Sequence, residues 1–255
     1  MRKPIIVGNW KMNLNHLEAI ALVQKLSYRL EKEVFDNCEV VVCPPFTSLR
    51  SVQTTIDSDK MQISLGAQNV NENEKGAYTG EVSSAMLTKL NVSYVIVGHS
   101  ERRAFAGETD EQIALKVKAI RKNNMTPILC VGETKEQREA GQSIEVVESQ
   151  VRNGLASIAK TEIENCIIAY EPVWAIGAGT PATIEQANEI IFHIRSVIDS
   201  MKSGVSDVTR VIYGASVDPG NSKLFLSQDG IDGLLVGGAS LDADDFSRLV
   251  ISAIK

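Results

Sequence analysis

The sequence lacks the features that mark a zinc-binding, secreted or membrane-spanning protein. Its four cysteines form no C-x-x-C pair, so the usual spacing of a zinc or thiol–disulfide motif is missing. Three of them (Cys43, Cys130 and Cys166) lie in apolar runs, which favours buried, reduced thiols. No stretch approaches the roughly 20 apolar residues of a membrane helix, and the apolar run after Met1-Arg2-Lys3 is too short for a signal peptide. We therefore expect a soluble cytoplasmic protein.

The chain also lacks an excess of positive charge. Its formal net charge is −6 and its pI is about 5.2. Without a basic field it has no electrostatic attraction for nucleic acid or for anionic membranes, so we expect neither partner. Hydrophobic residues make up 44% of the 255 positions, enough for a large core, and no linker or low-complexity segment interrupts them. We expect residues 1–255 to form a single domain.

Short apolar runs alternate with polar or glycine-bearing turns and with segments of helical period. Eight runs recur about every 32 residues, and their length suits strands that are buried on both faces. They are Ile5–Val7, Val40–Cys43, Ile63–Leu65, Val92–Val97, Ile128–Val131, Ile167–Tyr170, Val211–Tyr213 and Leu234–Val236. This pattern predicts an α/β fold, a closed (β/α)₈ barrel. A doubly wound open sheet is the alternative, but no G-x-G-x-x-G follows the first run.

Capping signals mark several of the intervening helices. Asn15 and Glu18 have capping-box spacing at the start of a helix predicted over 17–30. Thr183 and Gln186 have the same spacing before a longer apolar segment. Apolar residues at helical period predict two more helices, one over 111–122 and one that begins at Asp242.

Residues that directly follow the strands of such a barrel line its carboxyl-terminal rim, where catalytic groups lie. Asn9 and Lys11 follow the first run, His99 the fourth, Glu133 the fifth and Glu171 the sixth. Gly-Ala-Ser follows the seventh run and Gly-Gly-Ala-Ser the eighth, where backbone N–H groups of these barrels bind phosphate. The rim therefore indicates an enzyme that acts on a phosphorylated anion.

The stretch after the sixth run has an unusual composition for a loop. Glu171 is held at the mouth of the strand by the proline that follows it. The next residues, Val173–Ile176, are apolar, and Gly177 and Gly179 come after them. An apolar flap between a proline and two glycines is typical of a lid that expels water from a site. The alternative is a buried strand-to-helix turn in which the glutamate is a cap.

Four separated motifs in this order resemble the triosephosphate isomerase family, and the resemblance runs from the first strand to the last helix. The motifs are Asn9-Trp10-Lys11-Met12-Asn13, the run Val97–Arg103, the stretch Ala169–Gly179 and the run Leu235–Ser240. The resemblance implies interconversion of dihydroxyacetone phosphate and glyceraldehyde 3-phosphate through an enediolate, a step of glycolysis and gluconeogenesis. It implies no metal and no cofactor.

The resemblance also implies a role for each site residue. Glu171 would be the base, His99 a neutral electrophile on the carbonyl oxygen, and Lys11 and Asn9 the groups that stabilise the oxyanion. The flap at 172–182 would close over the phosphate. The residues implied to contact substrate are Asn9, Lys11, Gly177, Ser216, Gly237 and Gly238.

A long polar loop follows the third run, over residues 70–84. Loops of this length without regular structure are usually functional or disordered. In the family that the chain resembles, this loop inserts into a second subunit, and Thr79 would reach the partner's active site. We expect a homodimer.

Other functions and roles remain open at this level. A barrel that only binds a sugar phosphate would not need Glu171, and an aldolase with a Schiff-base Lys11 would leave Glu171 without a role. A metal-dependent aldolase would need a ligand cluster that the sequence does not provide. We expect structural roles for His16 and His193, for Trp10 and Trp174 in packing, and for Cys130 as a small buried side chain. We expect Glu101 to orient or to pair with neighbouring charges, Arg102 and Arg103 included.

Three positions depart from the family's usual pattern. Ala215 stands where a second glycine is usual, Ala178 where threonine is frequent, and Pro181 lies in the trailing hinge of the flap. If the residue at 215 must reach a positive φ as the flap closes, alanine makes that step costlier.

Pro181 generates a prediction. Proline restricts its own φ and the residue before it, and here it precedes the helix capped by Thr183, so its geometry suits a closed flap. Compatible prolines are worth about 0.4–1 kcal/mol, so Pro181→Ala should weaken binding of an enediolate analogue by roughly two- to fivefold. Calorimetry measures the effect, with inorganic phosphate as the less affected comparison. Tighter analogue binding by the variant would show that the proline hinders closure.

Overall fold

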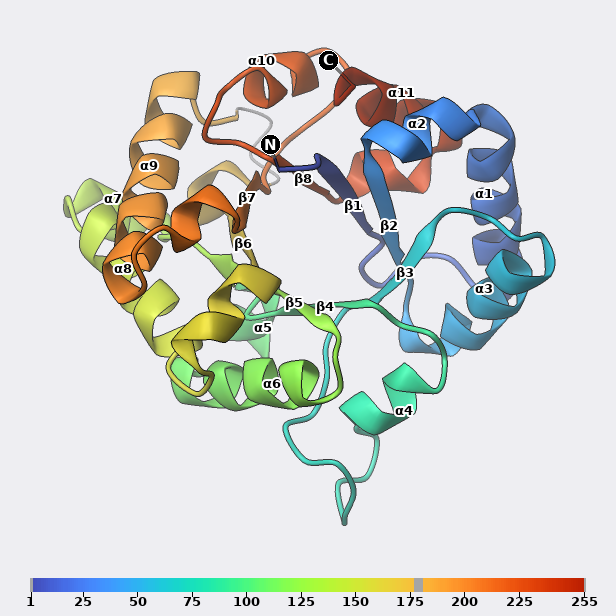
Figure 1. Ribbon diagram of the computed structural model, residues 1–255, viewed down its shortest axis with the longest axis horizontal. Helices are drawn as coiled ribbons and strands as arrows, with labels where there is room; N and C mark the ends of the chain where they lie inside the picture. Colours follow the sequence, from blue (N-terminus) through green and yellow to red (C-terminus); the bar gives the residue numbers. More distant parts are fainter. Residues whose placement is uncertain (1, 177–180, 255) are drawn as a thin grey trace.

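The computed structural model describes residues 2–176 and 181–254, and it shows a closed barrel of parallel strands inside a ring of helices (Figure 1). The strands are β1 (Ile5–Asn9), β2 (Glu39–Cys43), β3 (Ser64–Ala67), β4 (Tyr94–Val97), β5 (Thr126–Val131), β6 (Ile167–Tyr170), β7 (Arg210–Tyr213) and β8 (Gly233–Val236). Each strand pairs with the next one along the chain, and β8 pairs with β1. The predicted barrel is confirmed, and the open-sheet alternative is wrong.

Helices and short 3₁₀ segments connect the strands on the outside of the barrel. The helices are α1 (His16–Arg29), α2 (Lys32–Asn37), α3 (Phe46–Ser58), α4 (Ser84–Thr88), α5 (Ser100–Phe105), α6 (Asp110–Lys122), α7 (Lys135–Glu139), α8 (Ser143–Gly154), α9 (Ile184–Met201), α10 (Ser222–Leu226) and α11 (Ala243–Ser252). The 3₁₀ segments are η1 (Lys160–Asn165), η2 (Val173–Ala175), η3 (Val205–Asp207) and η4 (Gly238–Leu241). Within the described ranges, no helix is both long and apolar enough to cross a membrane.

The strands are buried on both faces, as the continuous apolar runs predict. In β1, Ile5 and Val7 belong to the cluster inside the barrel, whereas Ile6 belongs to the larger core between the strands and the helices. All three side chains are fully buried. Alternate residues of a strand therefore fill two different cores, which leaves no polar face to solvent.

The predicted caps form, and every strand except β6 differs from its predicted run by one or two residues at an end. Asn15 with Glu18 and Thr183 with Gln186 both make complete capping boxes. Strand β3 lies one to two residues later than predicted, at Ser64–Ala67, and β4 begins at Tyr94 rather than at Val92. The N–H of Val92 donates to the carbonyl of Leu87 at the end of α4 (3.3 Å), so Val92 still belongs to the turn.

The loop between β3 and α4 extends away from the barrel (Figure 1). A backbone hydrogen bond from Asn71 to Val82 (2.8 Å) and a bridge between Asn71 and Ser83 close its base. Lys122 of α6 pairs with Glu74 at 2.6 Å. The loop is thus tied to the barrel at its base and at one side, while Thr79 is exposed.

Candidate active site

The carboxyl ends of β1, β4, β6, β7 and β8 surround a cavity of about 250 Å³. Such a volume is below the roughly 300–1,000 Å³ of drug-sized ligand pockets, so it suits a smaller molecule. Asn9, Lys11, His99, Glu171, Ser216, Gly237 and Gly238 all line it. The structure therefore brings the predicted site residues together, except Gly177, which lies outside the described residues together with Ala178.

Glu171 follows β6 and is 3% exposed. Its N–H donates to the carbonyl of Val131 (2.8 Å), which continues the pairing of β6 with β5 past the last strand residue. A Cβ on Gly132 would lie 1.8 Å from the carbonyl oxygen of Glu171, and one on Gly214 would lie 3.2 Å from its Cγ. The glutamate therefore fits a slot that requires glycine at position 132 on one side and has little spare space at position 214 on the other.

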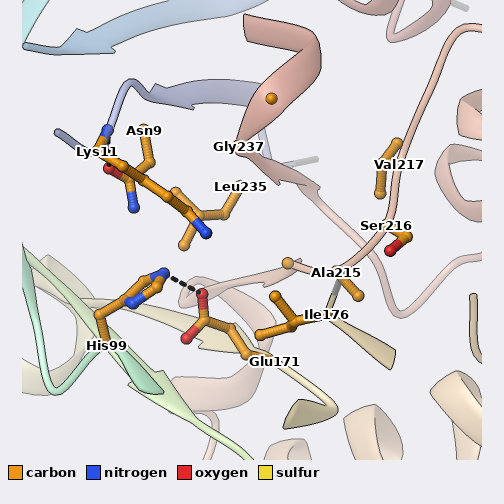
Figure 2. A pocket seen from close by; sticks show the side chains of 12 residues that line it. Asn9, Lys11, His99, Glu171, Ile176, Ala215, Ser216, Val217, Leu235 and Gly237 are labelled. Carbon is orange, nitrogen blue, oxygen red and sulfur yellow. Dashed lines mark hydrogen bonds and ion pairs between the residues drawn. The ribbon is translucent and has the colours of Figure 1, made fainter. Parts of the chain in front are cut away.

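His99 follows β4 and caps α5. Its Nδ1 accepts a hydrogen bond from the N–H of Glu101 (3.2 Å), so Nδ1 carries no proton and the proton of the neutral ring lies on Nε2. Nε2 lies 3.2 Å from Oε1 of Glu171. The helix start thus sets the tautomer, and Figure 2 shows a ring nitrogen of His99 facing the Glu171 carboxylate.

Lys11 and Asn9 approach from β1, on the opposite side of the cavity (Figure 2). The backbone of Lys11 has a φ of +51°, an uncommon value for a residue with a side chain. Its N–H donates to Oδ1 of Asn9 (3.1 Å), and Gln68 donates to its carbonyl (2.8 Å). These two bonds hold a strained backbone that turns the ammonium toward the cavity.

The far side of the cavity carries backbone and hydroxyl groups from β7 and β8. A Cβ on Gly237 would lie 3.4 Å from Cε of Lys11, so the lysine passes close to this glycine. Gly238 is exposed and has no neighbour within 4 Å of such a Cβ. The Ser216 hydroxyl donates to the carbonyl of Ala175 (2.8 Å), which links the loop after β7 to η2. Ala215 beside it does not have a positive φ here.

Glu101 does not pair with Arg102 or Arg103, so that part of the prediction is wrong. Its carboxylate pairs with Lys11 Nζ at 2.6 Å. Arg102 pairs with Glu108 (2.5 Å) and Arg103 with Asp110 (2.6 Å). Residues one and two apart on a helix do not face each other, so the three side chains of α5 point to different partners.

Sequence reasoning missed the role of a second buried carboxylate, Glu133. It is fully buried and accepts hydrogen bonds from the Tyr170 hydroxyl (3.2 Å), from Trp174 Nε1 (2.8 Å) and from Arg138 (3.3 Å). Burial and the Glu133 carboxylate hold the pKa of Tyr170 well above its usual range, so the phenol remains a donor. Arg138 also lies over the Trp174 ring, 4.3 Å from its centroid. The one signal in the sequence is that Glu133 directly follows a strand. Its partners lie in β6, η2 and α7, so the contacts themselves have no local signature.

The remaining candidates lie away from the cavity or are packed. His16 is exposed in the first turn of α1, and His193 pairs with Glu148 at 3.1 Å. Trp10 is fully buried in the outer core. Burial and the nearby Glu171 carboxylate raise the pKa of the Cys130 thiol, which agrees with a small, unreactive core side chain.

Comparison with known proteins identifies related sequences. Residues 4–253 match the family described as "Triosephosphate isomerase". The chain is 52% identical to the triosephosphate isomerase of Saccharopolyspora erythraea over 249 residues, which cover 97% of this chain and 95% of the relative. It is 51% identical to that of Streptomyces coelicolor over 250 residues, which cover 98% of this chain and 97% of the relative. It is 49% identical to that of Mycobacterium avium over 253 residues, which cover 99% of this chain and 97% of the relative.

The Glu133 cluster generates a prediction about the segment after β6. Trp174→Phe keeps an aromatic ring under Arg138 but removes the donor to Glu133, a bond to a charged group worth about 1.5–3 kcal/mol. The amides of Ala175 and Ile176 should then exchange with solvent about tenfold faster or more, as hydrogen-exchange mass spectrometry can measure. Tyr170→Phe, which removes a donor to the same carboxylate from the strand, should leave those amides unchanged. Equal exchange in the wild type and Trp174→Phe would contradict this role.

Proposed function

The chain belongs to the triosephosphate isomerase family, and from this membership we propose that it interconverts dihydroxyacetone phosphate and D-glyceraldehyde 3-phosphate at the cavity described above. The reaction moves one proton between neighbouring carbons, through an enediolate. It needs a base, an electrophile at the carbonyl oxygen and a site for the phosphate. We propose further that residues 1–255 act as one domain, which the family match over 4–253 supports.

One observation carries the proposed mechanism, namely the 3.2 Å approach of His99 Nε2 to Glu171 Oε1 across the cavity. Bound substrate would replace this contact, so that the carboxylate faces C1 and the imidazole faces the carbonyl oxygen at C2. Glu171 takes the C1 proton and the enediolate forms. His99 gives its Nε2 proton to the C2 oxygen and takes up the proton that the C1 hydroxyl loses, and Glu171 then returns its proton to C2. No atom enters or leaves the substrate.

Lys11 and Asn9 stabilise the charge that develops. The Lys11 ammonium passes close to Gly237 and is paired with Glu101, so it lies between the carbonyl end and the phosphate end of the substrate. The Asn9 side chain is 5% exposed and lines the same cavity. A cation and an amide fixed in a site that excludes water interact with an oxyanion more strongly than they would in bulk water.

The phosphate occupies the end of the cavity formed by β7 and β8. There Ser216, Gly237 and Gly238 offer a hydroxyl and backbone N–H groups, and Gly177 of the flap completes the set. The flap over 172–182 closes over the bound phosphate. Support comes from its described part, because Ile176 lines the cavity and Ser216 contacts the Ala175 carbonyl. Closure would expel water from the reacting groups.

The protein acts as a homodimer through the loop at 70–84. Large apolar side chains that monomers usually bury are exposed on or next to this loop, Tyr78 (47%) and Met86 (56%), and in the segment after β1, Met12 (95%). Gln68 at the base of the loop bonds to the Lys11 carbonyl, so the loop and the catalytic lysine share one support. Thr79 near the loop tip would contact the partner. A cytoplasmic location suits the four buried free thiols.

The base has a direct test. Glu171→Gln keeps the shape of the side chain but cannot accept the proton, so kcat should fall by about 10²-fold or more. Binding of inorganic phosphate should stay within about twofold, since the phosphate end is unchanged. A coupled assay with glyceraldehyde 3-phosphate measures the rate, with and without chelator. Glu136→Gln on the exposed side of α7 is the control, with wild-type kcat. More than about a tenth of wild-type kcat in Glu171→Gln would remove Glu171 from this role.

Assembly has a separate test. Replacing residues 73–80 by a Gly-Ser link keeps the Asn71–Val82 contact at the base and removes the loop tip. We expect a monomer in sedimentation and a kcat reduced at least about tenfold, because a partner would no longer support Lys11. Tyr78→Ser should weaken the dimer, whereas Tyr28→Ser removes a more exposed tyrosine of α1 (90%) and should not. A trimmed protein that sediments as a fully active dimer would contradict the proposal.

A further inference from the structure

Arg103 is a partly buried cation that the proposed mechanism does not use. It lies on α5, its side chain is 18% exposed, and it does not line the cavity. Its guanidinium contacts three different elements. Nε donates to the carbonyl of Gly98 (2.8 Å), Nη2 to the carbonyl of Cys130 (3.3 Å), and Nη1 to Oδ1 of Asp110 at the start of α6 (2.6 Å). Arg103 therefore joins the carboxyl ends of β4 and β5 to a helix outside the barrel.

The position of the guanidinium depends on Gly98. Gly98 has a φ of +67°, which side chains rarely adopt. A Cβ there would lie 3.1 Å from Arg103 Nη2, 3.2 Å from the carbonyl oxygen of Cys130 and 3.0 Å from Ile113. The arginine thus lies against position 98, where the backbone is in the left-handed region and a side chain would have no space. The bond from Nε in turn fixes the direction of the Gly98 carbonyl.

Both strand ends held by Arg103 carry groups of the proposed chemistry. The Gly98 carbonyl belongs to the peptide bond that leads into His99, so its direction sets where the His99 backbone begins. Cys130 precedes Val131, whose carbonyl accepts the N–H of Glu171 (2.8 Å). One side chain therefore fixes the backbone of the histidine and of the strand that holds the glutamate. A shift of either backbone changes the distance between His99 Nε2 and Glu171.

We propose that Arg103 is a positioning residue for the isomerisation, holding His99 against Glu171 through the carbonyls of Gly98 and Cys130. The inference rests on the proposed function of that pair. Arginine suits this role because its planar fork donates in three fixed directions at once. Lysine at this position would keep the charge for Asp110 but would not hold both carbonyls in the same geometry.

The test separates kcat from binding. A misplacement of about 1 Å in a catalytic group costs on the order of 10²-fold in rate, so Arg103→Gln and Arg103→Lys should each lower kcat about 10- to 100-fold. The affinity for inorganic phosphate should stay within about twofold, since Ser216, Gly237 and Gly238 come from β7 and β8. In spectra of ¹⁵N-histidine-labelled protein, the His99 resonances should shift, while those of His16 and His193 should not.

Arg121 offers a matched control. It is 14% exposed, pairs with Glu162 and donates to the carbonyl of Met125 (2.8 Å), which lies before the start of β5, at the other end of the barrel. Arg121→Gln should lower the melting temperature as much as Arg103→Gln does, yet retain kcat within about twofold. Asp110→Asn, which leaves both carbonyl bonds of Arg103 in place, should also retain most of kcat.

The outcomes distinguish the two proposals. Wild-type kcat in Arg103→Lys and Arg103→Gln, or equal kcat losses in Arg103→Gln and Arg121→Gln, would overturn the positioning role. If Arg103→Gln does not fold, Arg103→Lys, which keeps a cation for Asp110, provides the same readout. A wild-type protein that does not isomerise triose phosphates would instead refute the proposed function, and the histidine spectra of the variants would still report whether Arg103 positions His99.

Discussion

The pairing of β8 with β1 closes the sheet, and closure decides where every strand ends. Ile5 of β1 lies beside Gly233 of β8, and a Cβ on that glycine would be only 1.8 Å from the Ile5 carbonyl oxygen. Because all pairs are parallel, the carboxyl ends of all the strands meet at one rim. Lys11 and Glu171 are far apart in the chain and line the same cavity for this reason alone.

Three buried carboxylates at or near this rim are each held by a different set of donors. Removing a carboxylate from water costs several kcal/mol unless hydrogen bonds replace the lost hydration. The Glu133 carboxylate accepts hydrogen bonds from a tyrosine, a tryptophan and an arginine. Burial acts to raise the pKa of Glu108, but hydrogen bonds from Lys116 and Arg102 outweigh it and hold that pKa below its usual value. Among the described residues, Glu171 contacts the Ser100 N–H (3.4 Å) and the His99 ring. Of the three, Glu171 is the one that lines the cavity and that has no lysine or arginine partner among the described residues.

Local signals in the sequence predicted the elements well and the contacts poorly. Capping boxes and apolar periodicity depend on residues within one turn or one strand, so α1, α9 and the strands were predictable. The start of β4 was not, because the hydrogen bond from Val92 to Leu87 has no signature in composition. The partner of Glu101 was predicted among its sequence neighbours and turned out to be Lys11, on another strand.

The sequence by itself determined which chemical groups follow each strand, because strand ends and glycine-bearing turns are local features. These local features are enough to identify Asn9, Lys11, His99 and Glu171 as candidates. Only the tertiary structure decided how these groups are supported. The bonds from Arg103 to Gly98 and Cys130, from Gln68 to Lys11 and from Trp174 to Glu133 join residues between 5 and 57 positions apart. Such contacts depend on the closure of the barrel and on side-chain direction, and neither is encoded in the spacing of residue types along the chain.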